Sequence, residues 1–208
     1  MIIAIDGPAA SGKGTLAKRL AAHYGLPHLD TGLLYRAVAR VLLDNDTSLA
    51  DEPAAAEVAA TLDLDHLDET RLRGRQMGEA ASMISGHPRV RAALLAFQQR
   101  FAAQPSGAVL DGRDIGTMVC PGADVKLFVT ASPQERARRR HRELLARGEV
   151  AEYAAILEDI ERRDARDSTR MAAPLKSATD AIILDTTALG PDAAFRAALA
   201  HVEAARPA

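Results

Sequence analysis

The stretch Gly7-Pro8-Ala9-Ala10-Ser11-Gly12-Lys13-Gly14-Thr15 decides the fold of this 208-residue chain. An apolar run, Ile2–Ile5, precedes it, and a helix-forming stretch, Leu16–Tyr24, follows it. A strand, a glycine-rich turn and a helix in this order are the context of a phosphate-binding loop. The two glycines at the ends of the turn would let consecutive backbone N–H groups point inward, where they and the positive helix N-terminus hold phosphate oxygens. We therefore expect all nine residues of the stretch to bind a nucleoside triphosphate.

Two side chains of the loop carry chemistry of their own. Lys13 can follow the β- and γ-phosphates as a point charge, and Thr15 places a hydroxyl in the first helical turn, where a magnesium ligand would sit. Gly14 separates them, whereas the strict motif has Ser or Thr directly after the lysine. The run Gly-Lys-Gly-Thr is common in nucleoside monophosphate kinases. By itself the loop indicates only nucleotide binding, because GTPases, motor ATPases and small-molecule kinases all contain it.

Apolar runs elsewhere in the chain predict the rest of the sheet. Three of them, Ala108–Leu110, Val125–Val129 and Ala181–Leu184, read as buried strands, and Pro27–Leu29 reads as a shorter one. Helical patterns separate these runs, which predicts an α/β fold with a central, parallel, five-stranded sheet flanked by helices. We expect the P-loop NTPase fold in one domain spanning residues 1–208.

Composition excludes several classes of protein. A net charge of −2 and 3% aromatic residues argue against nucleic-acid binding. A single cysteine, Cys120, permits no internal disulfide, and the six histidines lack metal-ligand spacing. The chain has neither an N-terminal signal sequence nor an apolar run near the roughly 20 residues of a membrane span. We therefore expect a cytoplasmic monomer that acts on small molecules.

Arginines crowd one predicted helix. The capping box Ser132-Pro133-Gln134-Glu135 should open a helix that runs to about Gly148, and a second helix should cover Ala151–Arg166. In the first helix Arg136, Arg139 and Arg140 fall on one face. Salt bridges between neighbouring turns explain most charges of the second helix, but arginine outnumbers acid in the first. The three arginines suit a lid that closes over phosphate, and we assign them and Lys13 catalytic roles.

Two further segments suit a second phosphate site. Thr31 could cap a helix after the short strand, and Arg36 lies on that helix; capping alone could explain Thr31 but not Arg36. Asp111 directly follows a buried strand, where ligands bind in open α/β sheets, so it is placed to hold magnesium with Thr15. Arg113 and Asp114 then offer opposite charges to a polar ligand.

Six segments occur in order along the chain: Gly7–Thr15, Asp30-Thr31-Gly32-Leu33-Leu34-Tyr35-Arg36, Ala80-Ala81-Ser82, Pro88-Arg89-Val90-Arg91, Asp111-Gly112-Arg113-Asp114-Ile115-Gly116-Thr117 and Arg163-Asp164-Ala165-Arg166-Asp167-Ser168-Thr169-Arg170. Together they closely resemble the bacterial cytidylate kinase family over nearly the whole chain. The resemblance implies transfer of a phosphoryl group from ATP to CMP or dCMP with Mg²⁺. It also implies a core of residues 1–30, 105–131 and 171–208, a monophosphate-binding region of residues 31–104 and a lid region of residues 132–170, the last two helical.

The resemblance implies roles for individual residues. Ser82, Arg91 and Asp114 match family residues that read the cytosine edge, and Asp114 could accept from the cytosine amino group. The residues that match the surroundings of the monophosphate are Thr31, Arg36, Arg113 and Arg170. The residues that match contacts to the sugar hydroxyls are Arg163 and Asp167.

The chain departs from the family pattern in two places. Thr31 replaces the usual serine, and Asp63–Arg71 is too short for the small β-rich insert that members commonly carry. Two alternatives remain open: a kinase for another acceptor such as UMP, and a nucleotide-dependent binding module without turnover. The absence of an Asn-Lys-x-Asp-type segment argues against a regulatory GTPase.

Overall fold

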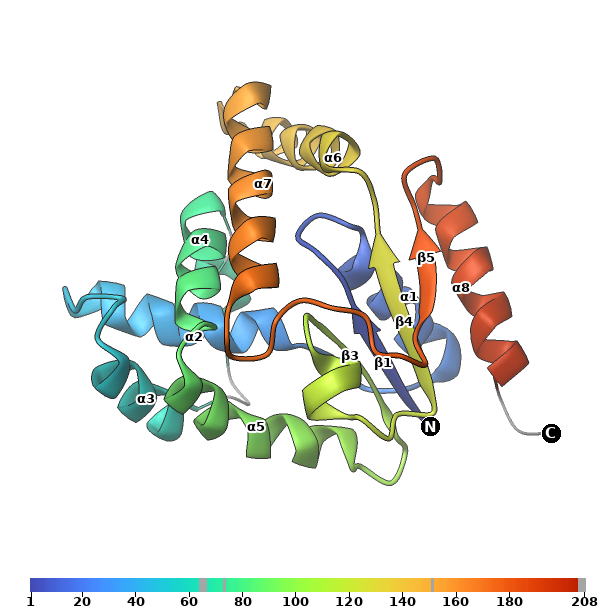
Figure 1. The fold of residues 1–208 in the computed structure, drawn as a ribbon, viewed down its shortest axis with the longest axis horizontal. Coiled ribbons are helices and arrows are strands. Elements are labelled where there is room, and N and C mark those ends of the chain that lie inside the picture. The colour runs from blue at the N-terminus through green and yellow to red at the C-terminus, as the bar shows by residue number, and fades with distance from the viewer. Residues whose placement is uncertain (64–66, 73, 151, 206–208) are drawn as a thin grey trace.

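A five-stranded sheet forms the centre of the computed structural model, which describes residues 1–63, 67–72, 74–150 and 152–205 (Figure 1). The strands are β1 (Ile2–Asp6), β2 (His28–Asp30), β3 (Ala108–Gly112), β4 (Val125–Thr130) and β5 (Ile182–Asp185). All neighbours pair in parallel, in the order β2-β3-β1-β4-β5. The parallel sheet and its five strands are confirmed, with each bound within two residues of the expected one.

The helices of the described chain lie between these strands and after the last of them. They are α1 (Lys13–Tyr24), α2 (Thr31–Asp44), α3 (Glu52–Thr61), α4 (Arg75–Ile84), α5 (Pro88–Ala102), α6 (Pro133–Ala146), α7 (Tyr153–Thr169) and α8 (Pro191–Ala205), with the short turns η1 (Glu69–Leu72) and η2 (Ile115–Val119). None of the described helices is long and apolar enough to cross a membrane.

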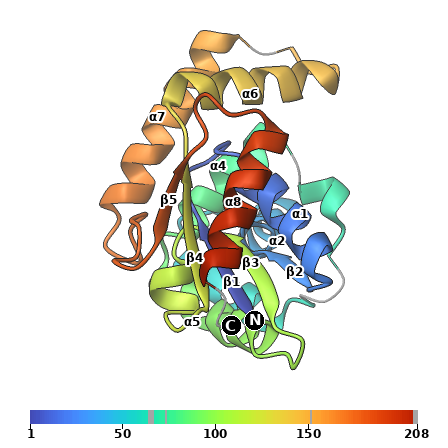
Figure 2. The same ribbon diagram turned by 90° about the vertical axis from the view of Figure 1, so that its right-hand side faces the viewer.

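Side chains alternate between the two faces of β1 and build a core on each. Ile3 and Ile5 are fully buried against α1 and α8, which lie together over one face of the sheet (Figure 2). Ala4 points the other way, toward α5 and η2. Burying each isoleucine contributes roughly 1.5–3 kcal/mol, so both faces hold the strand in place. The near-continuous apolar run at Ile2–Ile5 follows from this two-sided burial.

Two helical layers lie outside the sheet. The helices α2, α3, α4 and α5 share an apolar core of their own, and α6 packs against α7 over a smaller one. Figure 1 shows α6 and α7 beyond the tip of β4, with α4 beside α7. The helices thus surround the carboxyl ends of the strands, where ligands bind in open α/β sheets.

Local signals explain where these helices begin. Ser132 accepts a hydrogen bond from the backbone N–H of Glu135 at 3.2 Å, which confirms the predicted capping box of α6. The second lid helix, expected over Ala151–Arg166, is observed as Tyr153–Thr169, and residue 151 lies outside the described residues. Part of the short segment Asp63–Arg71, residues 64–66, also lies outside them.

Candidate active site

The loop between β1 and α1 adopts backbone conformations that side chains rarely permit. Gly7 has φ +153° and Gly12 has φ +92°, and a Cβ on Gly7 would lie 2.0 Å from the carbonyl oxygen of Val129. Gly12 precedes α1 without a side-chain cap, so the first N–H groups of the helix have no side-chain partner at that position. The buried hydroxyl of Ser11 also has no hydrogen-bond partner within the described chain. The loop therefore offers unpaired donors to an anion.

Two cavities meet at this loop. The first has a volume of about 780 Å³ and the second about 700 Å³. Lys13, Gly14 and Arg140 line both of them. The second cavity extends between the loop, Arg139 and the segment Thr186–Pro191. The site can therefore hold two ligands whose ends approach each other beside Lys13.

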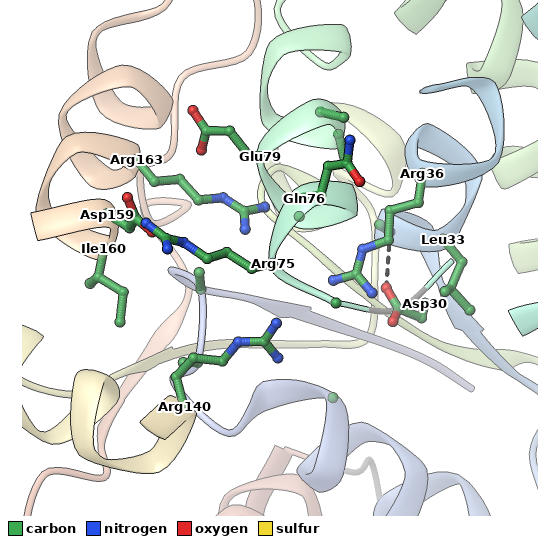
Figure 3. Close-up of a pocket in the computed structure, with 18 of the residues that line it drawn as sticks. Asp30, Leu33, Arg36, Arg75, Gln76, Glu79, Arg140, Asp159, Ile160 and Arg163 are labelled. Carbon is green, nitrogen blue, oxygen red and sulfur yellow. Dashed lines mark hydrogen bonds and ion pairs between the residues drawn. The ribbon is translucent and has the colours of Figure 1, made fainter. Parts of the chain in front are cut away.

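Cations dominate the first cavity. The guanidinium groups of Arg36, Arg140 and Arg163 come from α2, α6 and α7 and turn toward one space (Figure 3). Burial, together with the charge of Arg113, lowers the pKa of Arg163 and lowers that of Lys13 to about 8. The Nε atoms of Arg36 and Arg163 lack a hydrogen-bond partner within the described residues. Crowded, desolvated cations of this kind favour a multiply charged anion such as phosphate.

Two carboxylates lie in the same cavity. Oδ1 of Asp111 forms a hydrogen bond of 2.8 Å with Nε2 of His28. Its other oxygen, Oδ2, faces Gly14 and would lie 3.7 Å from a Cβ added there. Burial and the charge of Asp111 raise the pKa of Asp30. A divalent cation would relieve this repulsion, so the two carboxylates fit Mg²⁺.

Thr15 and Asp111 were expected to hold magnesium together, and they line different cavities. Thr15 is exposed and lines the second cavity, whereas Asp111 lines the first. The intervening Gly14, which has no side chain, is the residue that faces Asp111. The extra glycine of the motif moves the hydroxyl one position along the helix and therefore to another side of it.

The prediction that Thr31 caps α2 is wrong. Asp30 is the N-cap residue, and its side chain accepts from the backbone N–H of Gly32 at 2.9 Å. Thr31 begins the helix, and its buried hydroxyl donates to the carbonyl oxygen of Asp111 at 2.9 Å. Thr31 thereby joins the start of α2 to the end of β3, and its hydroxyl proton is not free for a ligand.

The three lid arginines have different surroundings. Arg136 is 3% exposed and donates to the carbonyl oxygens of Ala131 and Ala9 while it pairs with Asp164. Arg139 donates to the carbonyl oxygens of Ser11 and Thr186.

Within the described part of the chain, the side chain of Arg140 bonds only to Glu143 of its own helix, at 2.8 Å, and it reaches both cavities. Arg136 and Arg139 thus fasten α6 to the phosphate loop; Arg139 also lines the second cavity, and Arg140 lines both.

The residues expected to read a base lie in one buried network. Arg91 forms an ion pair with Asp114, and Ser82 donates to Oδ1 of Asp167 at 2.9 Å. Arg113 donates through Nε to the other oxygen of Asp167, also at 2.9 Å.

Arg170 lies at the edge of this network. It donates to the hydroxyl of Ser85 at 2.8 Å, and its NH2 group is buried without a hydrogen-bond partner in the described chain. The charge of Arg170 helps to hold down the pKa of Asp114, which burial raises. The structure therefore brings Ser82, Arg91, Asp114, Asp167 and Arg170 together, although they come from four separate segments.

Sequence reasoning missed Asp6, which lies directly before the loop. It is 4% exposed and accepts from the backbone N–H groups of Ile115 and Gly116 at 2.7 and 2.8 Å. Asp6 therefore fixes the segment that follows Asp114 against the end of β1. An acid that ends an otherwise apolar strand was the available signal.

Asp6 should give the stability of the protein a distinct pH dependence. Burial raises its pKa from 3.8 to about 6, against the effect of its two backbone hydrogen bonds. The native state then binds this proton more tightly than the unfolded state. The favourable contribution is complete below pH 3.8 and is lost as the pH rises through about 6, a change of about 3 kcal/mol.

Urea unfolding at several pH values would measure this effect against Asp6→Asn, which cannot ionise. The free energy of unfolding of the unsubstituted protein, minus that of the variant, should fall between pH 3.8 and pH 7. The comparison removes the contribution of the other carboxylates, and a constant difference would contradict the assigned pKa.

Gly112 is needed at the junction of β3, α2 and η2. A Cβ at this position would lie 2.5 Å from Oγ1 of Thr31 and 2.8 Å from Cδ1 of Ile115. Gly112→Ala should therefore destabilise the protein by about 1–3 kcal/mol and break the bond between Thr31 and Asp111. Gly122→Ala is the matched control, because nothing lies within 4 Å of its added Cβ. Urea unfolding of the two variants measures the difference, and equal stabilities would refute the argument.

Comparisons with known proteins show which sequences and structures this chain resembles. The model of the cytidylate kinase family matches residues 3–203. Curated relatives named cytidylate kinase include one from Methylobacterium sp. (strain 4-46), 68% identical over 100% of this chain and 99% of the relative. Another, from Xanthobacter autotrophicus, is 64% identical over 99% of both chains, so no large insertion separates the two.

Solved structures support the fold alone. An uncharacterized protein from Eubacterium ventriosum covers 98% of both chains with a TM-score of 0.57 and 15% identity. A protein from Thermus thermophilus covers 100% of this chain and 98% of its own length, with a TM-score of 0.50 and 23% identity. These similarities are consistent with the P-loop NTPase fold.

Proposed function

The chain belongs to the cytidylate kinase family, and from that membership we propose that it transfers the γ-phosphoryl group of ATP directly to CMP and dCMP. It is therefore an enzyme, a nucleoside monophosphate kinase. The observation that carries the proposal is the meeting of two cavities at Lys13, one beside the phosphate loop and one lined by arginines. A kinase needs this arrangement, because the donor and acceptor phosphates must approach each other in line.

We place ATP at the phosphate loop and in the second cavity. The backbone N–H groups of residues 7–15 and the start of α1 would hold the triphosphate, and the segment Thr186–Pro191 would lie along the rest of the nucleotide. Arg139 already fixes this segment through Thr186, so the cavity is preformed on that side.

We place the acceptor phosphate among the cations of the first cavity. Arg36 and Arg113 line it, and the desolvated Nε of Arg36 has no hydrogen-bond partner among the described residues. Arg163 could reach the acceptor from α7. Asp167 accepts from Arg113 and Ser82, and its remaining lone pairs would accept from a sugar hydroxyl.

The base would enter the network of Ser82, Arg91 and Asp114. Asp114 can accept from the amino group of cytosine, and Arg91 can donate to its ring nitrogen and carbonyl. Arg91 and Asp114 pair with each other in this structure, which holds the two groups side by side for these contacts.

Catalysis requires no strong base, because the acceptor phosphate is already an anion. We attribute the rate enhancement to alignment of the donor and acceptor phosphates and to neutralisation of the charge that moves between them. Lys13 and Arg140 reach both cavities and would follow that charge. Asp111, with Asp30 beside it, would hold Mg²⁺ directly or through water, and the ion would neutralise phosphate oxygens when bound.

Closure of the helical regions would complete the site. We retain residues 31–104 as the monophosphate-binding region and residues 132–170 as the lid, around the core formed by the remaining segments. Both cavities form within one chain, which supports a monomer as the active unit. Light scattering coupled to size exclusion would measure that state.

The test is an ADP-release assay with ATP and Mg²⁺ across CMP, dCMP, UMP, AMP and GMP. We expect the highest kcat/KM for CMP or dCMP. Faster turnover of AMP or GMP would overturn the assignment, and ATP binding without acceptor-dependent ADP release would favour a binding module. UMP is the competitor of interest, because it differs from CMP only at the base edge.

A further inference from the structure

Arg166 joins the monophosphate-binding region to the lid region at a residue of the proposed base site. It lies on α7, and its Nε donates to the hydroxyl of Ser82 on α4 at 3.0 Å. Its NH2 group pairs with Glu79, one turn earlier on α4, at 2.7 Å. Figure 1 shows the two helices side by side. One guanidinium group thus holds two consecutive turns of the neighbouring helix.

The neighbours of Ser82 determine the direction of every hydrogen bond that its hydroxyl makes. A hydroxyl has one proton and two acceptor lone pairs. Arg166 has no acceptor, so Ser82 must accept from it. The ionised carboxylate of Asp167 has no donor, so Ser82 must donate to it, at 2.9 Å. The charges of Arg113 and Arg163 lower the pKa of Asp167 and keep it ionised.

Among the described residues these two bonds leave one acceptor lone pair on Ser82 and no proton. Ser82 is 2% exposed, so a wrong partner for that lone pair would remain unsatisfied away from water. An incoming amino group can donate to the lone pair, whereas a carbonyl oxygen would face it with a second acceptor. Cytosine and uracil differ in this respect at position 4 of the ring, which bears an amino group in one and a carbonyl in the other.

We propose that Arg166 is a positioning residue which, with Asp167, holds Ser82 as a pure acceptor and so makes the site select cytosine over uracil. The inference rests on the proposed function, because it takes Ser82 to be a contact of the base. Arg166 itself lines neither of the two cavities. It fixes the rotamer of Ser82 and the spacing of α4 and α7.

The first experiment measures kcat/KM for CMP and for UMP in Arg166→Met, which keeps much of the apolar stem and removes every donor. The value for CMP should fall about tenfold, mainly through KM, because a positioned hydrogen bond is worth about that factor. The kcat/KM for UMP should change less than threefold, so the ratio of the CMP value to the UMP value should fall. The KM for ATP should stay as in the unsubstituted enzyme. Arg138→Met removes an exposed arginine of α6 whose side chain pairs with Glu135, and it should leave the ratio unchanged.

A double-mutant cycle separates positioning from simple helix bracing. In a Ser82→Ala background Arg166→Met should no longer change the ratio of CMP to UMP, because the residue it positions is gone. If the substitution narrows the ratio equally in both backgrounds, or leaves it unchanged in the first, the proposal is wrong. Arg166→Lys keeps a donor but cannot bond to Ser82 and Glu79 at once as the guanidinium does, so it should recover part of the selectivity for CMP. It replaces Arg166→Met in the cycle if that variant fails to fold.

The unsubstituted enzyme distinguishes failure of this inference from failure of the proposed function. No turnover of CMP would overturn the function. Turnover of CMP and UMP with equal kcat/KM would still support a pyrimidine nucleotide kinase, but it would overturn the selectivity for cytosine that we argue from Ser82.

Discussion

Lys13→Met should lower kcat by about 10³-fold and leave the fold intact. Lys13 lies where the two cavities meet, so its ammonium would be close to the phosphoryl group throughout transfer. Burial and the charge of Arg113 lower its pKa to about 8, which shows how poorly solvated the charge is. In such surroundings a cation interacts strongly with an anion, and the loss of one preorganised group of this kind costs about two to three orders of magnitude.

Methionine is the informative replacement because it keeps the length and the apolar packing of the lysine stem. Removing the buried ammonium also removes the free-energy cost of its desolvation, so thermal unfolding should show no loss of stability. The measurement is single-turnover phosphoryl transfer with saturating ATP and CMP, together with ATP affinity by calorimetry. Lys176→Met, at an exposed position, controls for loss of a positive charge. A kcat within threefold of the unsubstituted enzyme would remove Lys13 from the mechanism.

Local sequence signals were sufficient for the sheet and the loop. The strands are short apolar runs buried on both faces, and Gly7 and Gly12 have conformations that glycine readily adopts. The capping box at Ser132 predicted the start of α6 for the same reason, because donor and acceptor lie three residues apart. The order of the strands in the sheet, in contrast, depends on pairings across the whole chain.

The hydrogen-bond and ion-pair partners of individual polar side chains could not be predicted from such local signals. Arg136 was grouped with Arg139 and Arg140 by its place on one helix face, but its partners Ala9 and Asp164 lie far from it in sequence. Thr31 bonds to the carbonyl of Asp111, which only the pairing of β2 with β3 brings near.

Arg166 belonged to a charged helix face for which salt bridges between turns were a sufficient explanation. Its bond to Ser82 appears only when α7 meets α4. The sequence therefore identifies the residue types of the site, and the fold determines which of them are already bound to protein groups.

Asp114→Ala should raise the KM for CMP by about 10²-fold or more and leave ATP affinity nearly unchanged. Asp114 is the carboxylate proposed to accept from the cytosine amino group, and it does not line the second cavity, where we place ATP. The substitution also leaves Arg91 as a poorly solvated cation without its partner, and breaking a buried pair from one side costs about 3–5 kcal/mol. Stability and binding must therefore be measured separately.

The variant Asp114→Asn separates the two effects, because an amide keeps the shape and offers Arg91 an acceptor. It also carries an N–H donor, which the carboxylate lacks, so it can meet a carbonyl at the base edge. Asp114→Asn should therefore have a lower kcat/KM for CMP and a higher activity on UMP relative to CMP. The double variant Arg91→Met with Asp114→Ala should be more stable than Asp114→Ala alone, but it should not recover CMP binding. Calorimetric titration of each nucleotide gives the comparison, and equal losses of CMP and ATP affinity would show that Asp114 supports the fold rather than reading the base.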